Sequence, residues 1–60
     1  MPYVNLKLAG SITREQKQKI AQEITATLER HAHKPPEYTY ITFEEVAYED
    51  WAIAGKLLDE

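Results

Sequence analysis

The chain has 60 residues and no cysteine, so disulfides and thiolate zinc sites are excluded. Seven Lys and Arg against ten Asp and Glu give a net charge of -3 without a basic run, which argues against a nucleic-acid partner. No apolar stretch approaches the roughly 20 residues of a membrane span, and no segment has the pattern of a secretion signal. We therefore expect a cytoplasmic protein with no membrane partner.

The small size of the chain predicts an oligomer. A domain of this length buries only about 60% of the surface that its unfolded form exposes. Disulfides are excluded, and no metal-ligand set is apparent, so association of subunits is the remaining source of stability. We expect a single domain over residues 1–60.

Residues 3–8 alternate, with Val4, Leu6 and Leu8 on one face, which predicts a strand. The run Ala9-Gly10-Ser11 predicts a turn after it. Thr13 and Gln16 then fit a capping box, in which each side chain accepts a hydrogen bond from the other residue's backbone N–H. A helix should follow and end before Lys34, because prolines stand at positions 35 and 36. Its apolar stripe comprises Ile20, Ala21, Ile24 and Leu28, extended by His31 or Ala32.

Residues 38–46 are rich in aromatic and β-branched side chains and predict a second strand. Ile41 and Phe43 would share one face, and Tyr38, Tyr40 and Thr42 the other. Both faces carry bulky groups, so another copy of the chain should cover the second face. The segment 51–58, WAIAGKLL, suits a short strand or hairpin packed against a neighbouring subunit.

The order strand–helix–strand favours parallel strands joined by a right-handed crossover. The expected fold is a small βαβ subunit of the α/β or α+β class, with parallel strands and a short C-terminal hairpin. Its sheet would be completed by oligomerisation.

Four features together resemble the 4-oxalocrotonate tautomerase family: the start Met1-Pro2, the strand PYVNLKL, the helix opening EQK and the late segment WAIAGK. The resemblance implies βαβ subunits that pair through their sheets, commonly as hexamers of three dimers. It also implies that Pro2, once methionine is removed, acts as a general base without a cofactor or metal. The implied reaction moves a proton between the enol and keto forms of a small-molecule dienol or keto acid.

The chemistry of Pro2 depends on its nitrogen. While Met1 is attached, this nitrogen is a tertiary amide and Pro2 is only a residue tolerated at the start of a strand. After Met1 is removed it is a secondary amine, which must be neutral to accept a proton at pH 7. Burial in an apolar pocket, or a nearby cation, would lower its pKa towards the working pH.

The sequence departs from the family at two positions. The arginines that hold the substrate carboxylate and polarise its carbonyl correspond here to Ile12 and Tyr40, while an aromatic wall residue is retained in type as Trp51. Tyr40 can donate a hydrogen bond to an enolate oxygen but cannot form the bidentate charged contact of an arginine. The replacement cation, if there is one, is left open among Lys7, Arg14, Lys34 and Lys56.

Two hypotheses follow from these departures. In the first, Pro2 is the catalytic base and Tyr40 the catalytic hydrogen-bond donor, and Trp51 and Ile12 line an apolar substrate pocket. In the second, the chain is a catalytically weak or inactive subunit or binding module, in a homo- or hetero-oligomer.

Two other pairs of residues are given structural interpretations. His31 and His33 lie near the helix C-terminus, where cations favour the helix dipole, and they lack further ligands for a metal. Glu44 and Glu45 are adjacent in a strand and so point to opposite faces, which argues against a shared acid–base site.

Overall fold

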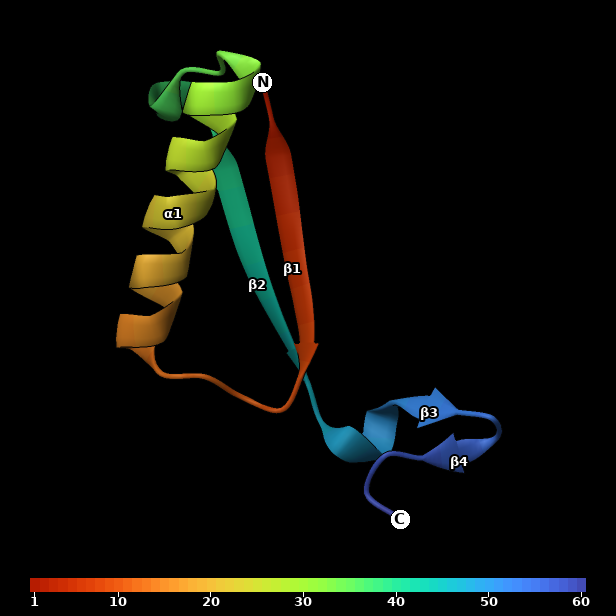
Figure 1. Cartoon of the computed structure of the whole chain (residues 1–60). Coiled ribbons are helices and arrows are strands. Elements are labelled where there is room, and N and C mark those ends of the chain that lie inside the picture. The colour runs from red at the N-terminus through yellow and green to blue at the C-terminus, as the bar shows by residue number, and fades with distance from the viewer.

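The computed structural model describes all 60 residues, and it has the predicted βαβ architecture with a C-terminal hairpin (Figure 1). Strand β1 pairs in parallel with β2, with Tyr3 opposite Tyr40 and Ala9 opposite Val46. A short antiparallel hairpin, β3–β4, follows. The elements are β1 (Tyr3–Ala9), α1 (Arg14–Ala32), the 3₁₀ turn η1 (Pro36–Tyr38), β2 (Tyr40–Val46), the 3₁₀ turn η2 (Tyr48–Asp50), β3 (Ala52–Ile53) and β4 (Lys56–Leu57).

Both ends of α1 are fixed by the residues that predicted them. The Thr13 hydroxyl accepts from the backbone N–H of Gln16 at 3.1 Å, and the Gln16 side chain accepts from the N–H of Thr13 at 2.8 Å. At the other end His33 adopts a left-handed conformation, φ 56°, and its N–H donates to the carbonyl of Glu29. The predicted capping box is confirmed, and the helix ends before Lys34 as predicted.

Helix α1 covers one face of the two-stranded sheet (Figure 1). The half-buried side chains of the strands alternate as predicted, and the predicted helix stripe is half-buried against them. This inner face comprises Val4, Leu6, Leu8, Ile41 and Phe43 from the strands and Ile20, Ala21, Ile24 and Leu28 from α1. The extension of the stripe to His31 or Ala32 is wrong, because both residues are exposed at the last turn of the helix.

The second strand begins later than predicted. Tyr38 lies in η1, where its N–H donates to the carbonyl of Pro35, and β2 starts only at Tyr40. The Thr39 hydroxyl also donates to the Pro35 carbonyl, at 3.0 Å. The two prolines therefore start a tight turn that includes Tyr38, and this turn overrides the β-propensity of an aromatic residue.

The outer face of the sheet is open and carries a chain of hydrogen bonds. The Thr42 hydroxyl donates to Asn5 Oδ1 at 2.9 Å and lies 2.8 Å from the Tyr3 hydroxyl. Because the single proton of Thr42 is used towards Asn5, Tyr3 is the donor to Thr42. Asn5 Nδ2 donates to Glu44 Oε1 at 3.3 Å, and Glu44 Oε2 lies 3.7 Å from Lys7 Nζ. This face is ordered by polar contacts, yet nothing covers it.

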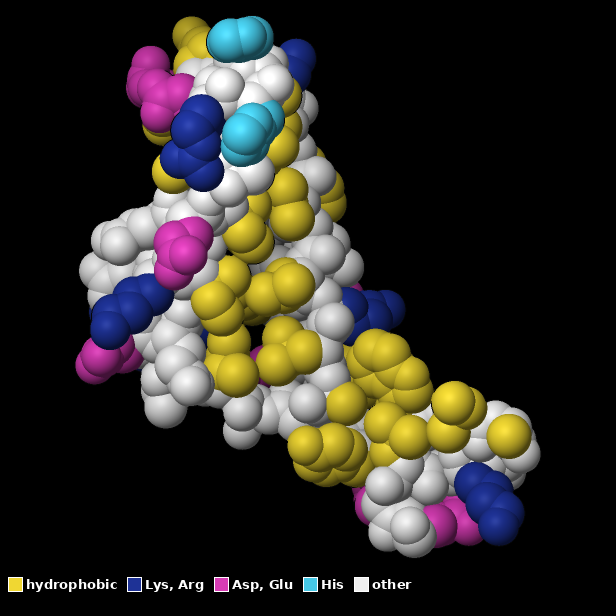
Figure 2. Space-filling model, viewed as in Figure 1, with side chains coloured by type: hydrophobic (Ala, Val, Ile, Leu, Met, Phe, Trp, Pro, Cys, Tyr) yellow, Lys and Arg dark blue, Asp and Glu magenta, His cyan; other side chains and the backbone are white.

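The C-terminal segment leaves the sheet and extends away from the rest of the chain (Figure 1). Ala54 and Gly55 both have positive φ, 54° and 80°, which suits the two-residue turn of the predicted hairpin. Hydrophobic side chains continue from the junction of helix and sheet onto this segment (Figure 2). The chain measures 42 × 24 × 14 Å and none of its residues is buried, as expected for a subunit that lacks a core of its own. No helix has both the length and the apolar character that a membrane span requires.

Candidate functional site

Pro2 and Tyr40 lie together at the end of the sheet where both strands begin. The backbone N–H of Tyr40 donates to the carbonyl of Pro2 at 3.0 Å. Their side chains occupy different faces, however. Tyr40 is opposite Tyr3 on the outer face, whereas the alternation that places Val4 inward also places Pro2 inward. The structure therefore joins the two residues through the backbone and directs the Tyr40 ring away from its own Pro2.

The surroundings of Pro2 suit a terminal amine. Pro2 itself is half-buried, whereas Met1 is 81% exposed. Removal of Met1 would therefore take away little packing and would leave the Pro2 nitrogen at the partly covered start of β1. Since Pro2 also accepts the Tyr40 hydrogen bond, its position is fixed by the sheet.

Ile12 and Trp51 lie at the opposite end of the sheet. Ile12 is in the connection between β1 and α1, and Trp51 follows η2; both are half-buried. The seven residues of β1 lie between Pro2 and this end, a length of about 20 Å at the usual rise per strand residue. The four predicted site residues thus lie at two separate ends of the sheet, and no small substrate could contact both ends of one chain.

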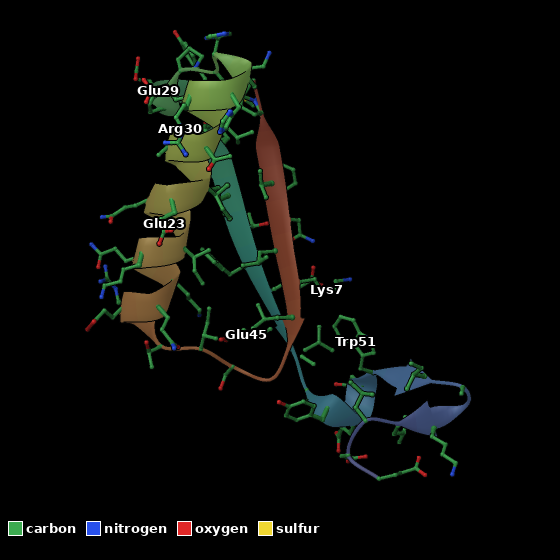
Figure 3. All side chains as sticks on the ribbon, in the orientation of Figure 1. Lys7, Glu23, Glu29, Arg30, Glu45 and Trp51 are labelled. Atoms are coloured by element: carbon green, nitrogen blue, oxygen red, sulfur yellow. The ribbon has the colours of Figure 1, made fainter.

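An open hollow of about 280 Å³ lies beside Trp51 and is also lined by Lys7, Val46, Asp50 and Ala52. Figure 3 shows Lys7 and Trp51 side by side there, at the end of the strands. Lys7 is therefore the one of the four candidate cations that lines a hollow with the predicted aromatic wall.

The other three candidate cations lie elsewhere. Arg14, the first residue of α1, lines a separate hollow with Lys17 and Phe43. Lys34 follows the C-terminal end of α1, and Lys56 is in the hairpin.

The connection that carries Ile12 is anchored by a residue whose role the sequence analysis missed. Glu45 Oε2 accepts a hydrogen bond from the backbone N–H of Ile12 at 2.9 Å and lies 3.4 Å from Lys17 Nζ. The hydrogen bond from Ile12 holds the pKa of the Glu45 carboxyl below its usual value, and Lys17 acts in the same direction against desolvation. Glu44 contacts Asn5 and Lys7 on the outer face, so the prediction that the two glutamates face opposite ways is confirmed.

A glycine and a tyrosine bring the C-terminal segment to the same connection. Gly10 has φ 88°, and a Cβ at this position would lie 2.9 Å from the Tyr48 hydroxyl. The Gly10 N–H donates to the carbonyl of Val46 at 2.8 Å. The turn after β1, the end of β2 and the start of η2 therefore meet at one point, close to Ile12 and Trp51.

Comparison with known proteins gives a consistent result along the whole chain. A family model described as "Tautomerase enzyme" matches residues 2–60. A "probable tautomerase" of Ralstonia nicotianae is 37% identical over 60 residues, which are 100% of this chain and 92% of the relative. The 2-hydroxymuconate tautomerase of Bacillus subtilis is 30% identical, over 100% of this chain and 97% of its own length.

Solved structures show the same fold. YwhB, described as a homologue of 4-oxalocrotonate tautomerase, superposes with a TM-score of 0.91 at 29% identity, over 98% of this chain and 97% of that one. A heterohexameric 4-oxalocrotonate tautomerase of Chloroflexus aurantiacus superposes with a TM-score of 0.89, over 100% of this chain and 97% of that one. At 20% identity this second likeness is one of fold.

Proposed function

Because the chain belongs to the tautomerase family, whose model matches residues 2–60, we propose that it is a cofactor-free keto–enol tautomerase with the amine of Pro2 as general base. The observation that carries the proposal is the position of Pro2. It stands at the start of β1, half-buried and hydrogen-bonded to β2, behind an exposed Met1. Removal of Met1 would leave a secondary amine whose direction is fixed by the proline ring.

The proposed reaction is a proton transfer in two steps. The neutral amine takes the proton of an enol hydroxyl, which gives prolinium and an enolate whose charge is shared between oxygen and carbon. Prolinium then returns a proton to the carbon, which gives the ketone and restores the neutral amine. Atoms and electrons balance without an oxidant or a second substrate. The step is most efficient when the amine pKa is near the working pH, and burial of the amine would lower that pKa.

The remaining site residues would come from more than one copy of the chain. Ile12 and Trp51 are about 20 Å from Pro2 along β1, and Tyr40 points to the outer face. We therefore place Pro2 of one subunit against the Trp51 end of another, with the Tyr40 hydroxyl as donor to the enolate oxygen. The absence of any buried residue, and the exposed Tyr3 and Tyr40, support a homo-oligomer, which in this family is commonly a hexamer.

The substrate should be less anionic than a dienol diacid. Ile12 offers an apolar wall where a charged group would hold a carboxylate, and Tyr40 offers one neutral donor. Lys7 lines the Trp51 hollow and could contact a single carboxylate, although it is paired with Glu44 and shares the hollow with Asp50. An enol or keto acid with one carboxylate and an apolar body fits these groups best.

Three measurements test the proposal. Intact mass shows whether Met1 is removed, and processed protein is then assayed for ketonisation of phenylpyruvate enol and of a 2-hydroxydienoate. Activity that is lost in Pro2→Ala, with the assembly unchanged by light scattering, supports an enzyme. An inactive processed wild type across several enol substrates would support the rival proposal of a non-catalytic subunit, and a stable monomer near 6.9 kDa would refute the shared site.

A further inference from the structure

Glu45 is the charged side chain that holds the connection between β1 and α1. We propose that Glu45 is a positioning residue of the pocket: its carboxylate fixes the backbone at Ile12 and so sets how Ile12 meets a bound substrate. The inference rests on the proposed function, because the pocket role of Ile12 belongs to it.

The contact has the geometry of a charge-assisted hydrogen bond. The Ile12 N–H donates to Glu45 Oε2 at 2.9 Å across 33 residues of sequence, and Lys17 Nζ lies 3.4 Å from the same oxygen. About a third of each side chain in the Lys17–Glu45 pair is exposed, 33% and 32%. In Figure 3 Glu45 lies between β2 and the start of α1, at the end of the sheet that carries Trp51. The carboxylate thus bridges a strand, a helix and the connection between them.

Three hydrogen bonds hold the backbone of this connection, and Glu45 accepts the middle one. On one side the Gly10 N–H donates to the Val46 carbonyl, and on the other the Thr13 N–H donates to the Gln16 side chain, both at 2.8 Å. The two outer hydrogen bonds do not involve Glu45. Removal of the Glu45 carboxylate should therefore free the backbone at Ile12 while both ends of the connection stay hydrogen-bonded, which predicts a local change in the pocket.

The same connection touches the segment that leads to Trp51. The Tyr48 hydroxyl would lie 2.9 Å from a Cβ at Gly10, so the start of η2 rests against the turn that precedes Ile12. Trp51 follows η2 directly. The turn that precedes Ile12 and the segment that leads to Trp51 are therefore in contact.

The Glu45 carboxylate stays ionised near neutral pH, so its hydrogen bond with Ile12 does not depend on pH in that range. The hydrogen bond from Ile12, and then Lys17, hold the pKa of the Glu45 carboxyl below its usual value against desolvation. A pKa lowered by folding contributes stability that is present above the unfolded value and lost as the pH falls through the lowered one. A pH profile of activity near neutrality should therefore report Pro2 and not Glu45.

The test uses the full chain after Met1 removal, with phenylpyruvate enol as the probe. Loss of a typical hydrogen bond changes an equilibrium by about two- to twelvefold, and this one is partly exposed, so Glu45→Ala should raise KM roughly three- to tenfold with kcat nearly unchanged. Glu45→Gln keeps an acceptor for Ile12 and should restore KM to about that of the wild type. Lys17→Gln removes the ion pair but keeps the Ile12 hydrogen bond, and should also resemble the wild type.

A matched control removes a carboxylate that has no link to the connection. Glu15 Oε1 lies 3.6 Å from Lys19 Nζ on the exposed surface of α1, so Glu15→Ala removes one charge and one ion pair there. Its KM should not change. A KM in Glu45→Ala that equals that of Glu15→Ala, in an active wild type, overturns the inference and leaves the proposed function standing.

Two further readouts separate positioning from a general loss of stability. In an Ile12→Ala background, Glu45→Ala should have no additional effect on KM, whereas additive effects would overturn the inference. Without substrate, the Ile12 amide proton should resonate at higher field in Glu45→Gln than in the wild type, and an unchanged resonance would also overturn it. An inactive wild type that retains the Ile12 hydrogen bond would instead refute the proposed function, and with it the pocket role of Glu45.

Discussion

The two ends of the β1–β2 sheet differ in what they offer to a reaction. The end where the strands begin carries Pro2, held by one backbone hydrogen bond to Tyr40 and covered only partly. The end where they finish carries Ile12 and Trp51, held by Glu45, Val46 and the contact of Tyr48 with Gly10. In the proposed reaction, the first end supplies the amine nitrogen of Pro2 and the second supplies an ordered wall.

This difference explains why a single chain is insufficient for the proposed reaction. A base needs a pocket that excludes water and orients the substrate, and the ordered wall needs a base. Since the two ends are about 20 Å apart, the proposed site would have to combine one end with the opposite end of another copy. The absence of a buried core and the requirement for a shared site therefore call for the same assembly.

The largest effect should come from the base itself. Pro2→Ala exchanges a secondary amine for a more mobile primary amine at the processed N-terminus, and we expect kcat/KM to fall by about 100-fold or more, within the range that general bases contribute. The assay is ketonisation of phenylpyruvate enol by protein whose mass shows that Met1 is absent.

Protein that retains Met1 provides the control for this prediction. Its Pro2 nitrogen is an amide, so it should be inactive although its sheet and assembly are unchanged. Equal activity with and without Met1 would exclude Pro2 as the base.

Mixing two variants tests whether one site combines the two ends of different subunits. Pro2→Ala lacks the base and Trp51→Ala lacks the wall, so each should be weakly active alone. If one site takes Pro2 and Trp51 from different subunits, random co-assembly of equal amounts should give about a quarter of sites with both residues intact. The measurement is the activity after co-refolding.

Two outcomes of the mixing experiment are informative. Activity that rises well above the mean of the two pure variants supports a shared site. Activity that stays at that mean would place both residues in one chain, which contradicts their separation along β1.

A smaller effect is expected from the donor to the enolate oxygen. Tyr40→Phe removes the hydroxyl and keeps the ring, so kcat should fall by about tenfold, as expected for one lost hydrogen bond in a partly exposed site. Tyr3→Phe is the matched control, because Tyr3 lies opposite Tyr40 on the same face but donates to Thr42. If both variants lose activity equally, the tyrosines serve the interface and not the chemistry.

Local patterns in the sequence predicted most of the subunit. The alternation over residues 3–8, the capping residues Thr13 and Gln16 and the two prolines each act through neighbours within a few positions, and all were found as expected. Tyr38 was placed in the wrong element because a proline-started turn competes with strand propensity over the same few residues.

The site could be predicted only in part, because its contacts are not local. No pattern in the sequence connects Glu45 to Ile12, which lies 33 residues away, and nothing near Gly10 indicates that Tyr48 rests on it. The division of Pro2 and Trp51 between two ends follows from parallel strands, but it becomes visible only once the register is known. Residue types suggested the chemistry, and topology decided which residues can meet.

The smallest effect concerns the contact of Gly10 with Tyr48 near Trp51. Its contribution to stability can be measured by comparing substitutions of two glycines. Gly10 and Gly55 both have positive φ, 88° and 80°, but only Gly10 has a neighbour where a Cβ would be. Left-handed backbone costs a non-glycine residue about 1–2 kcal/mol, so Gly55→Ala should lower the free energy of unfolding by that amount. Gly10→Ala should lower the free energy of unfolding further, because its Cβ would displace the Tyr48 ring.

The free energies of both variants are measured by denaturation at one protein concentration, since the stability of an oligomer depends on concentration. In a Tyr48→Ala background the extra loss at position 10 should disappear; if it persists, Tyr48 does not connect the hairpin segment to the turn.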